Sequence, residues 1–267
     1  MSNCKVIALT NQKGGVGKTT TAVNLGVSLV QQGKKVLLID ADAQANLTMA
    51  LGYNRPDDIP ITLSTVMQNI IDDKTLDVSQ GIIYHSEGVD LLPSNIEMSG
   101  FEVRLINAMS RERVLKTYVN EVKKNYDYVL IDCMPSLGMI TINALAAADS
   151  VIIPTQPHYL SAKGLELLLR SVSMVKRQIN PKLRIDGILM TMVMPRTNIS
   201  KEITATVKSA YGKKIKVFDT EIPHSIRAVE ATAEGKSIFA YDKSGKVAAA
   251  YEQLGKEVAE IGEKQIR

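Results

Sequence analysis

Short apolar runs recur along the chain, and each run is continuous rather than alternating. A run that is apolar on both faces is typical of a strand buried in a parallel sheet. The pattern therefore predicts strands at Lys5–Thr10, Lys35–Asp40, Val89–Pro93, Tyr128–Asp132, Ser150–Pro154 and Ile185–Met192.

Helical stretches lie between several of these runs. They are predicted from Lys18 to about Gln32, and at Glu102–Lys124, Ala162–Gln178, Ile199–Tyr211 and Lys246–Gly262. Gly33 should end the first helix, because glycine commonly follows a helix C-terminus. Alternating strands and helices predict an α/β fold with a mostly parallel twisted sheet flanked by helices on both faces. Ligands of such a sheet gather at the carboxyl ends of its strands.

The chain has no linker, repeat or low-complexity tract among its 267 residues. Asn54–Pro60 is a polar, proline-marked loop, which we interpret as an excursion rather than a domain boundary. We expect one domain over residues 1–267. Because the first predicted strand begins at Lys5, we expect no N-terminal helix-turn-helix extension.

A glycine-rich loop, TNQKGGVGKTTTAVN, joins the first predicted strand to the first predicted helix. The usual phosphate-binding loop reads G-x-x-x-x-G-K-[ST]. Counting back from Lys18, the first glycine of that pattern is replaced by Gln12, and an additional lysine, Lys13, follows it. Gly14, Gly15 and Gly17 permit positive φ and close backbone approach, so their amides can form an anion-binding nest ahead of a helix N-terminus.

The order of strand, glycine loop and helix favours a nucleoside triphosphate site over a glycine-rich turn with a chance lysine. Lys18 is placed to reach the terminal phosphates, and the Thr19 hydroxyl to bind Mg²⁺. Mg²⁺ also needs a carboxylate, and predicted strands end at Asp40 and Asp132, with Asp42 close behind the first. Asp132 is the candidate for a water-mediated metal contact, and Asp42 for holding the attacking water. Asp40 has either a site role or only a turn-capping role.

Composition agrees with a globular protein, since 45% of the residues are hydrophobic and 22% are charged. The two cysteines, Cys4 and Cys133, are far apart, which argues against a disulfide framework or zinc ribbon. The sequence has neither a signal-peptide pattern nor an apolar stretch near the about 20 residues that span a bilayer. The net charge of +4 permits an anionic partner without requiring one.

Four longer motifs and one short one carry a resemblance to a known family. They are KGGVGKTT (residues 13–20), LLIDADAQANLT (37–48), YVLIDCMPSLG (128–138), IPHSIRAVEA (222–231) and RTN (196–198). Together they resemble the ParA/Soj partition ATPases, the DNA-segregation branch of the deviant Walker A, or MinD/ParA, class of P-loop NTPases. The resemblance covers nearly the whole chain and implies that the ligands are ATP and Mg²⁺.

The resemblance implies a role for each matching residue. Lys13 matches the signature lysine, which reaches the ATP of the other subunit in a nucleotide sandwich dimer. Asp42 matches the aspartate needed for hydrolysis, and Asp132 the Walker B acid. The phosphates of the same subunit are assigned to Gly14, Gly15, Val16, Gly17, Lys18, Thr19 and Thr20, the adenine to Pro223 and Ser225, and DNA to Arg196 and Arg227.

The chain departs from the family pattern in two motifs. Where members often read DPQ, it has Asp42-Ala43-Gln44, which keeps the catalytic aspartate. Where they often read IPRN, it has His224-Ser225 after the proline, so the base preference is less defined.

The family's function is a DNA-segregation switch. ATP drives dimerisation, the dimer binds double-stranded DNA non-specifically, and slow hydrolysis stimulated by a ParB-type centromere-binding protein releases it. This implies a cytoplasmic, nucleoid-associated ATPase without membrane binding. A cluster of basic residues in the last third agrees with DNA-backbone contact; it comprises Arg196, Lys201, Lys208, Lys213, Lys214, Lys216 and Arg227, followed by Lys236, Lys243 and Lys246.

Two other functions use the same loop. A MinD-like positioning ATPase would end in a membrane-binding amphipathic helix. Here the last helix has Leu254, Val258 and Ile261 on one side and neither Phe nor Trp, which favours a helix packed on its own domain. An iron–sulfur reductase of the nitrogenase iron-protein type would need two suitably placed cysteines, which Cys4 and Cys133 do not provide.

Overall fold

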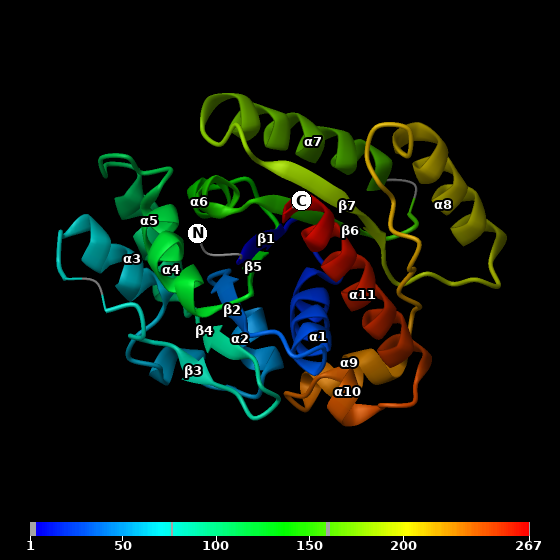
Figure 1. Ribbon diagram of the computed structural model, residues 1–267, viewed down its shortest axis with the longest axis horizontal. Coiled ribbons are helices and arrows are strands. Elements are labelled where there is room, and N and C mark those ends of the chain that lie inside the picture. The colour runs from blue at the N-terminus through cyan, green and yellow to red at the C-terminus, as the bar shows by residue number, and fades with distance from the viewer. Residues whose placement is uncertain (1–3, 76, 159–160, 267) are drawn as a thin grey trace.

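Seven strands form the central sheet of the computed structural model, which describes residues 4–75, 77–158 and 161–266 (Figure 1). The strand order is β3-β4-β2-β5-β1-β6-β7. Only the short β3 pairs antiparallel within the described sheet. The bounds are β1 Lys5–Leu9, β2 Val36–Ala41, β3 Ile83–Tyr84, β4 Asp90–Leu92, β5 Tyr128–Cys133, β6 Ser150–Thr155 and β7 Arg184–Met190. The predicted mostly parallel sheet is confirmed, and all the predicted strands are present.

Helices follow most of the strands and cover both faces of the sheet (Figure 1). Gly33 lies just beyond the first helix with φ 79°, as the sequence predicted. The α-helices are α1 Lys18–Gln31, α2 Asn46–Ala50, α3 Leu63–Ile71, α4 Glu97–Leu105, α5 Val114–Val122, α6 Met139–Ala147, α7 Ser161–Gln178, α8 Asn198–Tyr211, α9 Ile226–Ala233, α10 Ile238–Tyr241 and α11 Lys246–Ile266, with 3-10 turns η1 Pro56–Asp58 and η2 Lys123–Asn125.

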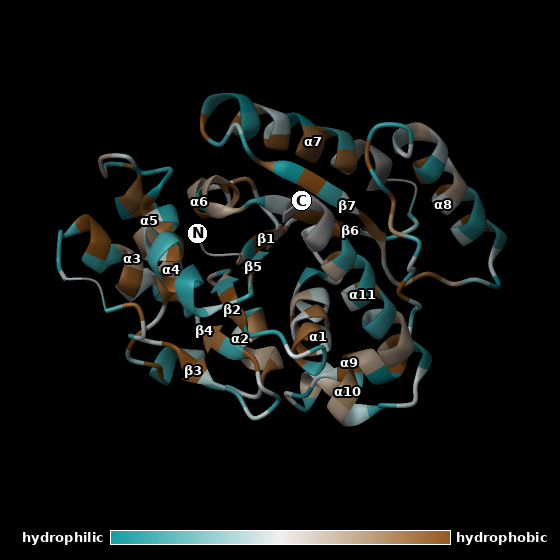
Figure 2. Ribbon diagram, viewed as in Figure 1, coloured by the Kyte–Doolittle hydropathy of each residue, from teal (hydrophilic) through white to brown (hydrophobic). Residues whose placement is uncertain are grey.

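Successive residues of the central strands face two hydrophobic cores. In β1, Val6 and Ala8 pack with residues of α3 to α7, whereas Ile7 and Leu9 pack with residues of α1 and α11. Burial on both faces explains why these strands read as continuous apolar runs. The covering helices need only one apolar face, and brown and teal residues accordingly alternate along α7 (Figure 2).

The predicted helix at Glu102–Lys124 is wrong, because α4 and α5 are separate helices joined by a loop over residues 106–113. Ser110 in this loop has φ 52°, a left-handed conformation that interrupts a helix. The buried side chain of Asn143 then completes the break. It donates to the Arg111 carbonyl at 2.7 Å and accepts from the Leu115 amide at 3.0 Å, inside the first turn of α5.

Two helices that the sequence analysis did not predict also pack on the sheet. The segment MITINALAA forms α6, which is buried on nearly all sides and therefore lacks the 3.6-residue periodicity of a surface helix. Helix α3 follows the polar loop after β2 and begins with a capping box at Thr62 and Thr65.

We predict that Asn143→Ala lowers the free energy of unfolding by about 1–3 kcal/mol, because it leaves a buried amide and a partly buried carbonyl unsatisfied. Urea denaturation of the purified chain measures this change. Asn120→Ala, at an exposed position on α5, is the matched control and should cost much less. Equal losses for the two variants would contradict the role given to Asn143.

Candidate functional site

The glycine loop lies between β1 and α1, at the carboxyl edge of the sheet. Gly15 has φ 69° and Gly17 φ 81°, in the left-handed region that favours glycine. Asn11, which is 4% exposed, holds the start of the loop. Its amide group donates to the Pro154 carbonyl at 2.7 Å, and its oxygen accepts from the Lys13 amide at 3.0 Å.

Lys18 and Thr19 occupy the first turn of α1, as the motif requires. The Lys18 ammonium lies 3.5 Å from the Lys13 carbonyl, and burial lowers the pKa of Lys18. Its charge is partly balanced by Asp132 and Asp42. The Thr19 hydroxyl donates to Oδ2 of Asp132 at 2.6 Å, so the two predicted metal-binding side chains are in direct contact.

Asp132 is a fully buried acid at the end of β5. Burial first, and then the charge of Asp40 on the neighbouring strand, raise the pKa of Asp132 from 3.8 to about 8. Among the described residues, its Oδ1 atom has no hydrogen-bond partner. A desolvated carboxylate with an unpartnered oxygen beside a hydroxyl is suited to a hard divalent cation such as Mg²⁺.

Asp40 has the turn role that the sequence left open. It accepts from the Thr48 amide at 2.8 Å, the Thr48 hydroxyl at 2.7 Å and the Asp42 amide at 3.2 Å. The Thr48 hydroxyl accepts in turn from the Ser94 amide. Burial raises the pKa of Asp40 to about 7. Asp40 therefore ties the segment that carries Asp42 to the sheet and does not line the cavity.

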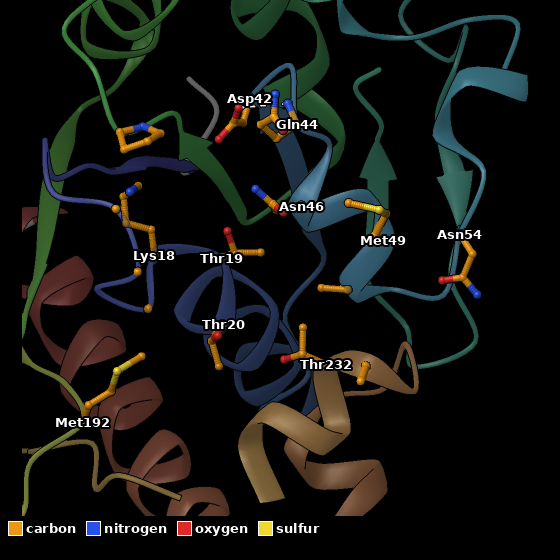
Figure 3. Close-up of a pocket in the computed structure, with 16 residues that line it drawn as sticks. Lys18, Thr19, Thr20, Asp42, Gln44, Asn46, Met49, Asn54, Met192 and Thr232 are labelled. Carbon is orange, nitrogen blue, oxygen red and sulfur yellow. Dashed lines mark hydrogen bonds between the residues drawn. The ribbon is translucent and has the colours of Figure 1, made fainter. Parts of the chain in front are cut away.

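A cavity of about 590 Å³ opens beside the glycine loop. Figure 3 shows Asn46 between Asp42 and Thr19, with Lys18 on the side of the loop. The Asp42 carboxylate accepts from the Gln44 amide at 3.0 Å, which orients it. The lining comprises Gly14, Gly15, Gly17, Lys18, Thr19, Thr20, Asp42, Gln44, Asn46, Met49, Ala50, Asn54, Pro135, Met192, Thr232 and Ala233.

A second cavity, of about 380 Å³, shares Gly17 and Thr20 with the first. Pro223 and Ser225, the two residues assigned to the adenine, both line it. Most of the other lining side chains are apolar or aromatic, including Ile222 and Tyr251. A largely apolar slot beside a phosphate loop has the chemistry to hold a flat heteroaromatic base.

Two loop residues lie outside both linings. The side chain of Val16 is buried, so this residue can serve a ligand only through its main chain. Lys13 is half-buried, and it differs from Lys18 because it lines neither of the two cavities.

The two predicted DNA-binding arginines are both exposed. Arg196 follows β7, and Arg227 lies on α9 with an ion pair of 3.2 Å to Asp242. A parallel bridge between Val193 and Pro223 joins the segments that lead to them. Other members of the basic cluster have acidic partners, with pairs at Lys208–Glu221, Lys216–Glu257 and Lys236–Glu234.

Sequence reasoning missed several residues around the loop. Gln44, Asn46 and Met192 line the first cavity. Gln44 and Asn46 belong to the motif of residues 37–48 but were given no role, and Met192 lies in none of the quoted motifs. Cys133 is buried in the hydrophobic core. Over the described residues, no helix has the length and apolar character to cross a membrane.

Comparison with known proteins gives the family. A model of an AAA domain matches residues 4–185. The chain is 44% identical to the sporulation initiation inhibitor protein Soj of Bacillus subtilis, over 97% of this chain and 99% of Soj. It is 37% identical to the chromosome partitioning protein ParA of Caulobacter vibrioides, over 95% and 93%. The chain belongs to the ParA/Soj family of partition proteins.

The fold also matches a solved structure with a different name. A cobyrinic acid a,c-diamide synthase from Mycobacterium smegmatis, crystallised with an ATP analogue and magnesium, is 34% identical with a TM-score of 0.82. The match covers 95% of this chain and 93% of that chain. The P-loop α/β fold predicted for this ParA/Soj family member is therefore confirmed.

We predict that the nucleotide-free Asp132→Asn variant is more stable than the unsubstituted chain at high pH. The pKa of the Asp132 carboxyl is higher in the folded chain than in the unfolded one, so the folded chain keeps the proton longer. The free energy of unfolding of the unsubstituted chain should fall between about pH 4 and pH 8. At pH 8 the free energy of unfolding of the variant should exceed it by more than about 1 kcal/mol.

Urea denaturation at pH 5 and pH 8 measures this difference. Mg²⁺ and ADP together should stabilise the unsubstituted chain much more than the variant, because Asp132 is the candidate metal acid. If the difference in free energy of unfolding between the two chains does not grow with pH, burial of the Asp132 carboxylate does not carry the cost given to it here.

Proposed function

We propose that this chain is an ATP-dependent DNA-segregation switch formed by one P-loop ATPase domain over residues 1–267. The observation that carries the proposal is the placement of the two loop lysines. Lys18 lines the cavity beside the loop, whereas Lys13 lies outside both cavities. The proposal assigns Lys18 to the nucleotide of its own subunit and Lys13 to the nucleotide of a second copy.

In this proposal, ATP occupies the two adjoining cavities, which share lining residues. Its phosphates would lie on the amides of residues 14–20, and its base between Pro223, Ser225 and the apolar wall. Thr19 would hold Mg²⁺ directly and Asp132 through water; this ion would neutralise charge on the phosphates. The ATP-analogue and magnesium complex of the M. smegmatis synthase supports this ligand pair.

The proposed dimer is held together by attraction between the bound ATP of one subunit and Lys13 of the other. Bound ATP retains negative charge even with Mg²⁺, and Lys13 from a facing subunit would contribute about 1.5–3 kcal/mol through a charge-assisted hydrogen bond. Loss of the γ-phosphate removes part of that attraction, so hydrolysis loosens the dimer. Dimer formation is thereby coupled to the state of the nucleotide.

Asp42 is the proposed catalytic acid for hydrolysis. Its carboxylate lines the cavity and is oriented by the Gln44 amide, so it can accept a hydrogen bond from the attacking water. Hydrolysis is slow until a partner completes the site. The proposed partner is a ParB-type centromere-binding protein, as the resemblance to the partition ATPases implies.

The proposed DNA surface contains Arg196 and Arg227. Both arginines are exposed, and the Val193–Pro223 bridge joins the segments from which they extend. Two copies double the number of cations that face the phosphates, so the ATP-bound dimer binds duplex DNA more tightly than the monomer. The protein would then act in the cytoplasm, on the nucleoid.

A MinD-like function is disfavoured by the packing of α11. Leu254 and Val258 are fully buried, and α11 lies against α1. Ile261 packs against the same core. The apolar face that would enter a lipid surface is thus already covered by the domain.

We predict that Lys13→Ala abolishes ATP-dependent dimerisation while ADP binding to the monomer persists. Asp42→Ala should instead trap the ATP-bound dimer, because it removes hydrolysis and leaves the phosphate contacts. Light scattering after size exclusion, with ATP or ADP, separates the two outcomes. Lys34→Ala, beyond the opposite end of α1, is the control and should behave as the unsubstituted chain. Normal dimerisation of Lys13→Ala would refute the second-subunit role.

We predict that Arg196→Glu with Arg227→Glu weakens ATP-dependent binding to duplex DNA about 10-fold or more, because four phosphate-facing charges are reversed in the dimer. Fluorescence anisotropy with a labelled duplex, at two salt concentrations, measures the loss. Lys74→Glu with Lys124→Glu is the charge-matched control at two exposed positions remote from Arg196 in the sequence. Equal losses for both double variants would point to net charge rather than to a defined DNA surface.

A further inference from the structure

Two side chains just beyond the ends of β6 and β7 donate hydrogen bonds to carbonyl groups of the glycine loop. Gln156, one residue after β6, donates its side-chain amide to the Gly15 carbonyl at 2.7 Å. Thr191, one residue after β7, donates its hydroxyl to the Val16 carbonyl at 2.8 Å. The two acceptors are consecutive peptide groups of the loop.

These contacts determine which way the loop amides point. In a trans peptide, the carbonyl of one residue and the N–H of the next are fixed in one plane and point in opposite directions. A donor that holds a carbonyl from one side therefore fixes the next N–H on the opposite side. Gln156 acts in this way on the Val16 amide, and Thr191 on the Gly17 amide.

Both donors are well placed for this task. Thr191 is 2% exposed, and its own amide donates to the Thr155 carbonyl at 2.9 Å, so its hydroxyl cannot easily reorient. The neighbouring Asn11 amide donates to the Pro154 carbonyl. The end of β6 is thus fastened to the loop at two points.

We propose that Gln156 and Thr191 are positioning residues of the nucleotide site, which hold the amides of Val16 and Gly17 toward the phosphates before a ligand arrives. This inference rests on the proposed nucleotide-binding function. It adds that the loop supplies the donor amides, whereas Gln156 and Thr191, beyond the ends of β6 and β7, fix the direction in which two of these amides point. Preorganised donors bind an anion without the cost of reorienting the backbone.

The test measures binding of Mg²⁺–ADP to the full chain by titration calorimetry, since ADP avoids dimerisation. Thr191→Val keeps the shape of the side chain but removes the donor, and affinity should fall about 3- to 10-fold, as expected for one hydrogen bond. Thr191→Ser keeps the donor and should stay within about twofold of the unsubstituted chain. A packing role would reverse this order, because serine loses the buried methyl group.

Gln156→Met provides a second variant at a less buried position, so the test does not depend on folding of the Thr191 variants. It should also lose about 3- to 10-fold in affinity. Gln178→Met, at the exposed end of α7, is its matched control and should bind as the unsubstituted chain.

The outcomes separate the inference from the function on which it rests. Failure of the unsubstituted chain to bind Mg²⁺–ADP would overturn the proposed nucleotide site. Normal binding by Thr191→Val and Gln156→Met would overturn the positioning role and leave the nucleotide site intact. Equal losses for Thr191→Ser and Thr191→Val would also overturn it.

Discussion

The parallel, in-register pairing of β2, β5 and β1 is the constraint on which the site depends. Asp132 pairs with Asp40 on one side and with Leu9 on the other, just before the glycine loop. This register brings Asp132, Asp40 and the glycine loop to one edge of the sheet. It also crowds desolvated negative charge there, and the buried Lys18 offsets part of it. The buried negative charge therefore lowers the stability of the ligand-free protein, and a bound cation would offset it.

Sequence patterns predicted the strands well, because strands buried on both faces leave long apolar runs. They were less informative about helices that lack a periodic face. Helix α6 is apolar all round, and the break between α4 and α5 depends on Asn143, a residue remote in sequence from that loop. Tertiary hydrogen bonds of this kind leave no local signal.

The candidate site divides in the same way. Lys18 and Thr19 lie where the fixed spacing of the loop motif places them. Asp42 and Asp132 were expected at the same edge because each lies at or just after the end of a buried parallel strand, and the structure places them there. The roles of these four residues stay predictions. Asp40 could not be assigned from its position at a strand end, and its three hydrogen bonds give it a structural role. The residues that shape the loop from outside come from distant strands, so only the folded chain brings them together.

The bridge between Val193 and Pro223 has a consequence for communication across the molecule. Pro223 lines the second cavity, and Arg196 follows Val193 by three residues. One pair of backbone segments therefore connects the wall of the second cavity to the exposed Arg196. If nucleotide binding shifts that wall, as the proposed function would allow, the shift has only a few residues of backbone to cross before it reaches Arg196.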